Sequence, residues 1–154
     1  MTLIRIISIL CLGIFLSGQA SNDGNLDEAF DKDSLIIEAS KHACYRFDVY
    51  LATSRAQQTR GLMFVRHLPE LTGMLFVYPQ QRLISMWMKN TYIPLDILFI
   101  RADGTIANIA RNTVPLSLDS IVAIEPLNFA LEVNAGLTER LAIDTDSRVY
   151  FPDL

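Results

Sequence analysis

Short strand-like segments joined by turn-forming residues fill most of this chain, and they limit it to a mainly β fold. β-Branched and aromatic residues alternate with polar ones in runs that end at Gly, Pro, Asp or Asn, as strands joined by tight turns do. The clearest turn is Asp103-Gly104, because an Asp-Gly pair between two strand-like runs is typical of a β-hairpin. The sequence contains neither a repeat of fixed period nor a helical pattern long enough for a bundle. We therefore expect a compact antiparallel β-barrel or β-sandwich that carries two short helices.

Local patterns place the individual elements. Strands are predicted at residues 35–39, 44–51, 74–78, 83–89, 96–102, 105–111, 121–124, 129–133 and 149–151. The first helix is predicted to follow Ser54, which forms a capping-box pattern with Gln57, and to end at Gly61. The second helix is predicted to begin after Asn134. Residues 97–100 are apolar on both faces, which indicates a strand that is covered on both sides.

Residues 1–20 have the form of a secretory signal peptide. Arg5 precedes an apolar run over residues 6–16, and small or polar residues follow it as far as Ala20. The run is too short to cross ~30 Å of hydrocarbon comfortably. We expect the segment to be cleaved rather than kept as an anchor, so that the protein is periplasmic or secreted and is not inserted in the membrane after cleavage.

The charge of the chain is concentrated near its N-terminus. Residues 21–34 hold five acids and one Lys without an apolar period, and they are predicted to form a flexible acidic leader. Residues 35–154 then form a single domain with 11 basic and 12 acidic groups, so nucleic-acid binding is disfavoured.

Only Cys44 remains after cleavage, and a free cysteine is most often a small buried residue.

Several motifs follow one another along this domain. They are Arg60-Gly61-Leu62-Met63, Gly73-Met74-Leu75-Phe76, Met86-Trp87-Met88-Lys89-Asn90-Thr91, residues 93–100, Asp103-Gly104 with Ile106, and residues 131–136. In this order they resemble the domain of unknown function 192 family, which comprises small and often exported bacterial and archaeal proteins, over most of residues 35–151. The resemblance implies a compact β-rich fold and no established reaction. The chain departs from the family at residues 144–147, where the family tends toward a Gly-Asp pair.

Motifs of the common enzyme and metal sites are missing from the sequence. It contains no G-x-S-x-G elbow, no H-E-x-x-H, no CxxC pair, no glycine-rich phosphate loop and no EF-hand loop. Its methionines lie among Phe, Leu and Val, which is typical of core residues rather than of a Cu(I) site. We therefore expect no metal and no cofactor, and we do not favour a standard enzyme class.

The most informative polar residues lie between Trp87 and Asp96. Lys89, Asn90 and Asp96 interrupt an apolar stretch, and charged groups in such a stretch must pair or reach water. As structural residues, Lys89 and Asp96 can form an ion pair, or Asp96 can accept backbone N–H bonds that fix the turn before the apolar strand. As binding residues, they can line a pocket with Trp87 as an apolar platform. The candidate binding residues are Trp87, Lys89, Asn90, Asp96, Arg60 and Glu132, of which the last two are lone charges beside apolar runs.

Three functions remain open on the sequence. We favour a binding or accessory module of the cell envelope, whose partner is a small polar ligand or an envelope protein. The alternative is an enzyme in which Asp96, Lys89 and Glu132 act as acids and bases. A purely structural β domain is the third. A strongly perturbed carboxylate or lysine in a water-accessible cleft would favour the enzyme.

Overall fold

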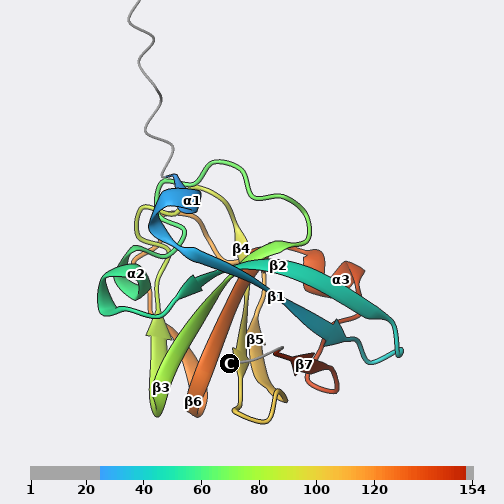
Figure 1. Cartoon of the computed structure of the whole chain (residues 1–154). Coiled ribbons are helices and arrows are strands. Elements are labelled where there is room, and N and C mark those ends of the chain that lie inside the picture. The colour runs from blue at the N-terminus through green and yellow to red at the C-terminus, as the bar shows by residue number, and fades with distance from the viewer. Residues whose placement is uncertain (1–24, 152–154) are drawn as a thin grey trace, which may run out of the picture.

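The computed structural model describes residues 25–151, and the predicted signal peptide lies outside these residues (Figure 1). In chain order the elements are α1 (Leu26–Ala29), β1 (Asp31–Glu38), β2 (Cys44–Ala52), α2 (Arg55–Arg60), β3 (Thr72–Met86), β4 (Leu95–Ile100), β5 (Ile106–Ala110), β6 (Ile121–Asn134), α3 (Leu137–Arg140) and β7 (Arg148–Tyr150). The mainly β prediction is confirmed, with one short helix more than expected. None of the described helices is long and apolar enough to cross a bilayer.

The strands form one sheet in the order β5-β4-β6-β3-β2-β1-β7. Neighbouring strands are antiparallel except β2 and β3, which run parallel. Parallel neighbours need a crossover connection, and the segment that contains α2 supplies it. The predicted antiparallel arrangement therefore applies to every pair but this one.

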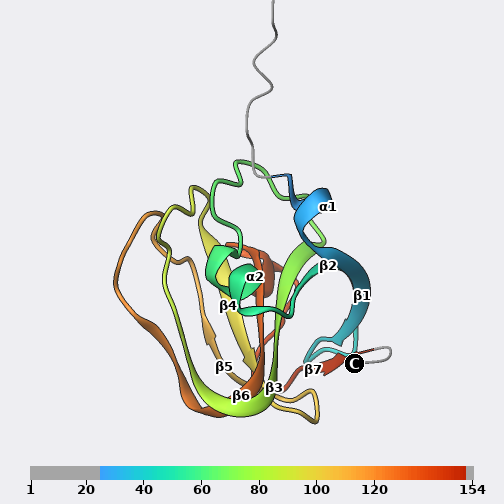
Figure 2. The ribbon, with the colours of Figure 1, turned by 60° about the vertical axis from the view of Figure 1, so that its left-hand side comes forward.

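The sheet curls into a half-barrel whose two edges touch at one point (Figure 2). The Val149 N–H donates a hydrogen bond of 2.8 Å to the Gly104 carbonyl, and Thr105 forms an isolated bridge with Arg148. Gly104 has a φ of +85°, and a Cβ at this position would lie 2.0 Å from the Val149 carbonyl oxygen. The predicted Asp103-Gly104 turn thus joins β4 to β5 and also allows the edges of the sheet to meet.

Substitution of Gly104 tests this contact between the edges. Gly104→Ala is expected to lower the free energy of unfolding by about 2 kcal/mol or more, because the methyl group overlaps a carbonyl and the left-handed backbone is strained. Gly136→Ala is the matched control, since Gly136 has a φ of +76° but open space around it, with its nearest neighbour 4.0 Å away. We expect the control to lose about 1 kcal/mol, from strain alone, in urea unfolding. Equal losses in the two variants would contradict the closure.

Two pairs of predicted strands are each one long, bent strand. β3 spans both predicted segments around Pro79, and β6 spans both segments around Pro126. The β3–β6 ladder contains register shifts in this region, where a residue without an N–H is tolerated. β3 also ends at Met86, so Trp87 and Lys89 lie in the following loop rather than in the predicted strand.

The N-terminal region differs from the sequence-based expectation in two ways. The predicted flexible leader is too long, because α1 buries Leu26, Phe30 is buried beside it, and β1 already begins at Asp31. This segment has few apolar residues among many acidic ones, so it shows no hydrophobic periodicity. The helix and the start of the strand could therefore not be predicted from the sequence. Cys44, expected to be buried, is exposed at the start of β2. It points to the face opposite the buried Phe47.

Hydrophobic residues cover both faces of the sheet at its centre. One cluster fills the inside of the curl and includes Leu137 of α3. The other lies on the opposite face, where Leu62 and Val65 from the segment after α2 cover the sheet. Every residue of β4 is buried, which confirms the predicted strand with two covered faces. A polar residue on β4 is therefore buried whichever face it points to.

Candidate functional site

Helix α2 is fixed at its start by the predicted capping box. The Ser54 hydroxyl accepts a hydrogen bond of 3.3 Å from the Gln57 N–H, and the Gln57 side chain accepts one of 3.0 Å from the Ser54 N–H. The Gln58 side chain donates a hydrogen bond of 2.8 Å to the Val77 carbonyl and so joins the helix to β3. The local sequence thus determines where α2 begins, and the Gln58 contact determines where it lies.

The end of α2 packs directly over Glu132 of β6. Gly61 ends the helix with a φ of +47°. A Cβ at Gly61 would lie 3.1 Å from Phe76 Cζ and 3.8 Å from Glu132 Oε2. A side chain at this position would crowd the Phe76 ring and touch the carboxyl group, so the glycine permits the close approach of helix and strand.

A small hollow lies between α2, the sheet and the loop after β3. In Figure 2 the paired strands β3 and β6 bend together at the lower edge of the molecule, and α2 lies between the two arms of the bend. The hollow has a volume of about 60 Å³. It contains four of the six candidate residues, namely Arg60, Trp87, Lys89 and Glu132. A space of this size holds a few waters or one small polar group, and it is far below the roughly 300 Å³ of a typical drug-sized site.

Glu132 forms the floor of this hollow. Its residue is 4% exposed, and Oε2 is one of two buried side-chain oxygens without a hydrogen-bond partner among residues 25–151. Burial alone raises the pKa of the Glu132 carboxyl from 4.5 to about 8. At neutral pH the group is therefore mostly protonated, and it can donate a hydrogen bond into the hollow.

Two cationic side chains, Arg60 and Lys89, lie at the rim of the hollow. The Arg60 guanidinium lies 5.4 Å from the centre of the Phe30 ring, and Lys89 Nζ lies 5.1 Å from the centre of the Trp87 ring. Such cation–π contacts hold the two side chains in place. Among the residues that the structure describes, neither cation lies within ion-pair distance of a carboxylate. The rim therefore carries two positive charges that no acid neutralises.

Tyr78 is a lining residue that the sequence analysis missed. Burial, which is the largest cause, and the nearby Glu132 both raise the pKa of its hydroxyl, while the facing Arg82 lowers it. The hydroxyl thus stays protonated at neutral pH and adds a donor to the wall. A tyrosine inside a predicted strand is indistinguishable from a core residue by pattern alone, so no signal in the sequence could identify it.

Asp96 lies on the opposite face of the sheet from Glu132. In the β4–β6 ladder Asp96 pairs with Val133, whereas Glu132 pairs with Ile97, and consecutive residues of a strand face opposite ways. Asp96 is fully buried. Its carboxylate accepts hydrogen bonds from the Asn112 N–H at 2.9 Å, the Thr138 N–H at 3.1 Å and the Thr138 hydroxyl at 2.7 Å. The structure does not bring Asp96 into the hollow. Asp96 instead accepts hydrogen bonds within the fold, which is the structural alternative considered above.

Asn90 forms a turn beside the hollow and is absent from its lining. It has a φ of +58°, which asparagine tolerates better than most residues. Its carbonyl accepts a hydrogen bond of 2.8 Å from the Phe64 N–H. Asn90 therefore ties the loop that carries Trp87 and Lys89 to the segment after α2. Its position is that of a supporting residue rather than of a ligand contact.

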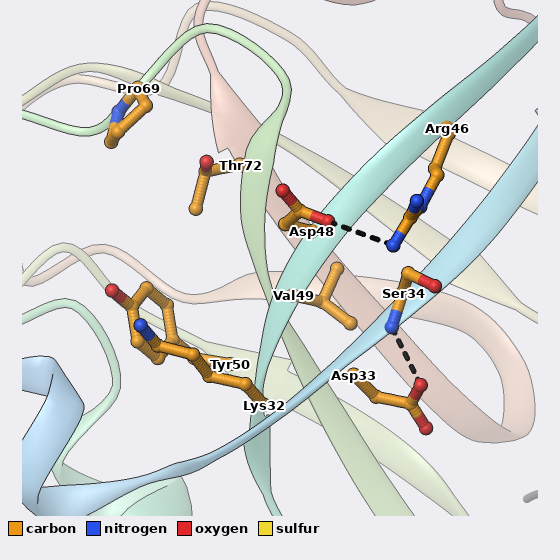
Figure 3. Close-up of a pocket in the computed structure, with 9 residues that line it drawn as sticks. All are labelled: Lys32, Asp33, Ser34, Arg46, Asp48, Val49, Tyr50, Pro69 and Thr72. Atoms are coloured by element: carbon orange, nitrogen blue, oxygen red, sulfur yellow. Dashed lines mark hydrogen bonds and ion pairs between the residues drawn. The ribbon is translucent and has the colours of Figure 1, made fainter.

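A larger hollow on β1 and β2 offers less chemistry (Figure 3). It has a volume of about 470 Å³, and its charged side chains are satisfied by neighbours. Arg46 pairs with Asp48 at 3.6 Å, and Lys32 pairs with Asp27 at 2.6 Å. The Tyr50 hydroxyl also donates to Asp27. Exposed and mutually paired charges need no ligand, so we place the candidate site at Glu132.

The hollow offers one acidic group and no set of metal ligands. Among the described residues, Glu132 is the only Asp, Glu, His or Cys in its lining. Within residues 25–151, no group of three such side chains lies close enough to hold a metal ion.

Comparisons with known proteins place the chain among uncharacterised relatives. The model of the domain of unknown function 192 family, described as Uncharacterized ACR, matches residues 36–151. A candidate transcription regulator from Sinorhizobium meliloti 1021 has a similar crystal structure, with a TM-score of 0.76 and 39% identity over 78% of this chain and 93% of that one. A protein of unknown function from Novosphingobium aromaticivorans DSM 12444 has a TM-score of 0.75 and 34% identity over 78% of this chain and 85% of that one. No curated protein matches the sequence.

Proposed function

The chain belongs to the domain of unknown function 192 family, and we propose that it is an exported binding module that takes a small polar ligand into the hollow above Glu132. The observation that carries the proposal is the buried Glu132 oxygen without a partner. A buried polar group that lacks a hydrogen bond costs about 1–3 kcal/mol. A ligand that hydrogen-bonds to Glu132 recovers this free energy, which a purely structural carboxyl would have recovered within the fold, as Asp96 does.

The place of action in this proposal rests on the sequence. The signal-peptide pattern of residues 1–20 supports export, and export would place the module in the periplasm or outside the cell. An envelope protein that inserts a small polar group into the hollow is the alternative partner. The cavity volume of about 60 Å³ favours a small ligand or a single side chain over an extended segment.

A second candidate function, proton transfer in an enzyme, is supported by the raised pKa of Glu132. General acids and bases work best when their pKa lies near the working pH, and the Glu132 pKa of about 8 meets this condition. A perturbed carboxylate in a cleft is also the feature that we expect of an enzyme. We place binding first because Glu132 Oε2 has no partner among the described residues, so no second group is in position to relay its proton.

The Sinorhizobium meliloti relative is described as a transcription regulator, but this does not lead us to propose DNA binding for the chain. A DNA-binding surface needs an excess of positive charge to neutralise phosphates. Residues 35–154 carry 11 basic and 12 acidic groups, which gives no such excess. We propose a role that does not involve nucleic acid. In agreement with it, the protein should be retained only weakly on duplex DNA, and this retention should not depend on the salt concentration.

Tryptophan fluorescence offers a direct test, because Trp87 is the only tryptophan of the chain and lies at the rim. The purified protein would be titrated with acetate, sulfate, methylammonium, glycerol and glucose. We expect at least one probe to change the emission saturably and to raise the melting temperature, by an amount equivalent to about 2.7 kcal/mol at a hundredfold excess over Kd.

Two variants identify the site of binding in this experiment. Glu132→Leu removes the polar floor and is expected to weaken the bound probe by about tenfold, or about 1.4 kcal/mol. Lys41→Ala, at an exposed lysine outside the hollow, is expected to leave Kd unchanged. Absence of any saturable change, or an equal Kd in Glu132→Leu, would contradict the proposed function.

A further inference from the structure

The charges around the hollow indicate the chemical class of its ligand. We infer that the ligand presents a small oxyanion, which Arg60 and Lys89 attract at the rim and to which the Glu132 carboxyl donates a hydrogen bond from the floor. This inference rests on the proposed function, since it concerns the same hollow. It also goes further, because it specifies the sign of the charge that the site accepts.

The first argument is electrostatic. The lining contains two cations and a single acid, and that acid is mostly protonated at neutral pH. Arg60 and Lys89 have aromatic partners but no carboxylate partner among the described residues. A hollow whose unpaired charges have one sign attracts ligands of the opposite sign. An ammonium group would instead face the repulsion of both cations.

The second argument concerns hydrogen bonding at the floor. A protonated carboxyl has an O–H that can donate, and an anionic oxygen is its strongest acceptor. Hydrogen bonds of the O–H···O⁻ type are roughly twice as strong as bonds between neutral groups. An oxyanion therefore satisfies the Glu132 carboxyl while Glu132 stays neutral, and the only negative charge that enters the hollow is that of the ligand.

The third argument is the shape of the site. The floor is closed by buried groups, namely Phe76, Leu62 and Glu132, whereas Trp87 at the rim is 45% exposed. A volume of about 60 Å³ accommodates the head of a carboxylate or of a tetrahedral anion and little more. The remainder of a longer ligand would lie outside, against the face of Trp87.

The surroundings of Glu132 determine the pH dependence of binding. The titratable and charged groups that line the hollow with it are Arg60 from α2, Tyr78 from β3 and Lys89 from the following loop. Its strand partners, Met74 of β3 and Ile97 of β4, are apolar. Burial raises the pKa of the Glu132 carboxyl to about 8, so the Glu132 proton is released between pH 7 and pH 9.

Competition between ionisation and binding provides the test. Acetate and sulfate are fully ionised from pH 7 to pH 9, and each would be titrated against the full chain by Trp87 fluorescence. With a Glu132 pKa of about 8, we expect the affinity of the bound oxyanion to fall about tenfold between pH 7 and pH 9. The comparison of acetate with sulfate shows whether the site accepts a carboxylate or a tetrahedral anion.

Glu132→Gln is the decisive variant, because its amide still donates a hydrogen bond but cannot ionise. We expect it to bind the same oxyanion at pH 7 within about threefold of the wild type and to keep that affinity at pH 9. Lys89→Ala is expected to weaken the oxyanion at both values. Lys41→Ala is again the control for overall charge.

The remaining outcomes separate this inference from the proposed function. Saturable binding of methylammonium that strengthens with pH, with no response to acetate or sulfate, would overturn the oxyanion and leave a ligand site at Glu132. Oxyanion binding with the same pH dependence in Glu132→Gln as in the wild type would also overturn it. Failure of every charged and neutral probe to bind would contradict the proposed function itself.

Discussion

Glu132→Gln is expected to remove most of a decrease in stability that the wild-type protein shows as the pH rises from 5 to 8. The unfolded chain releases the Glu132 proton near the ordinary pKa of 4.5, whereas the folded chain keeps it until about pH 8. Between these values the folded state binds one proton more than the unfolded state, so the free energy of unfolding falls as the pH rises. The stabilisation is fully present below pH 4.5 and is lost at about pH 8. Its size between pH 5 and pH 8 is about 4 kcal/mol.

The measurement is the difference in free energy of unfolding between variant and wild type at several pH values. Urea unfolding at each pH gives this difference, which cancels the contribution of all other titrating groups. We expect Glu132→Gln to gain about 1.4 kcal/mol per pH unit over the wild type in this range. Glu139→Gln, at an exposed glutamate of α3, is the matched control and should give a constant difference. A constant difference for Glu132→Gln as well would show that the carboxyl is solvated or paired.

Asp96→Ala is expected to destabilise the protein by about 3–5 kcal/mol, the cost of removing one partner of a buried charged network. The carboxylate accepts three hydrogen bonds, two from Thr138 and one from the Asn112 N–H. The N-cap residue of α3 is Gly136, which has no side chain to cap the helix, so Asp96 reaches across from β4 to do so. Alanine would leave the fully buried Thr138 hydroxyl and N–H without this acceptor.

Two further variants give this experiment its scale. Asp96→Asn keeps one acceptor oxygen and nearly the same volume. We expect its free energy of unfolding in urea to lie between those of the wild type and of Asp96→Ala. Asp146→Ala changes an exposed aspartate and should remain within about 0.5 kcal/mol of the wild type. A loss near zero for Asp96→Ala would show that its hydrogen bonds do not anchor α3. Unchanged ligand binding in Asp96→Asn would agree with its place outside the hollow.

Features that depend on neighbouring residues could be predicted from the sequence. The capping box of Ser54 and Gln57, the helix end at Gly61 and the turn at Asp103-Gly104 are all present. Each arises from the conformational preferences of a few consecutive residues. The prediction divided β3 and β6 at Pro79 and Pro126 because it considered only neighbouring residues. The register shifts that accommodate these prolines depend instead on the pairing of β3 with β6.

The composition of the site depended on strand register and was only partly predictable. Arg60, Trp87, Lys89 and Glu132 do share one hollow. Asp96 does not, because the register that pairs Ile97 with Glu132 turns Asp96 to the other face. A shift of this register by one residue would pair Asp96 with Glu132 on one face, and the amino-acid pattern of an all-buried strand does not determine that shift. Two buried acids only one register position apart thus have opposite roles, one satisfied and one open.

The protonation of Glu132 follows from its burial in the proposed site and is required by the proposed ligand class, and it can be observed directly. The carboxyl carbon of Glu132 can be followed by ¹³C NMR from pH 4 to pH 10, with Glu132→Gln to assign the signal. We predict a titration midpoint at about pH 8 in the free protein. We also predict a higher midpoint when acetate or sulfate is bound, because the anion binds the protonated form. A midpoint near the ordinary glutamate value of 4.5, or one that a bound anion lowers, would contradict the account.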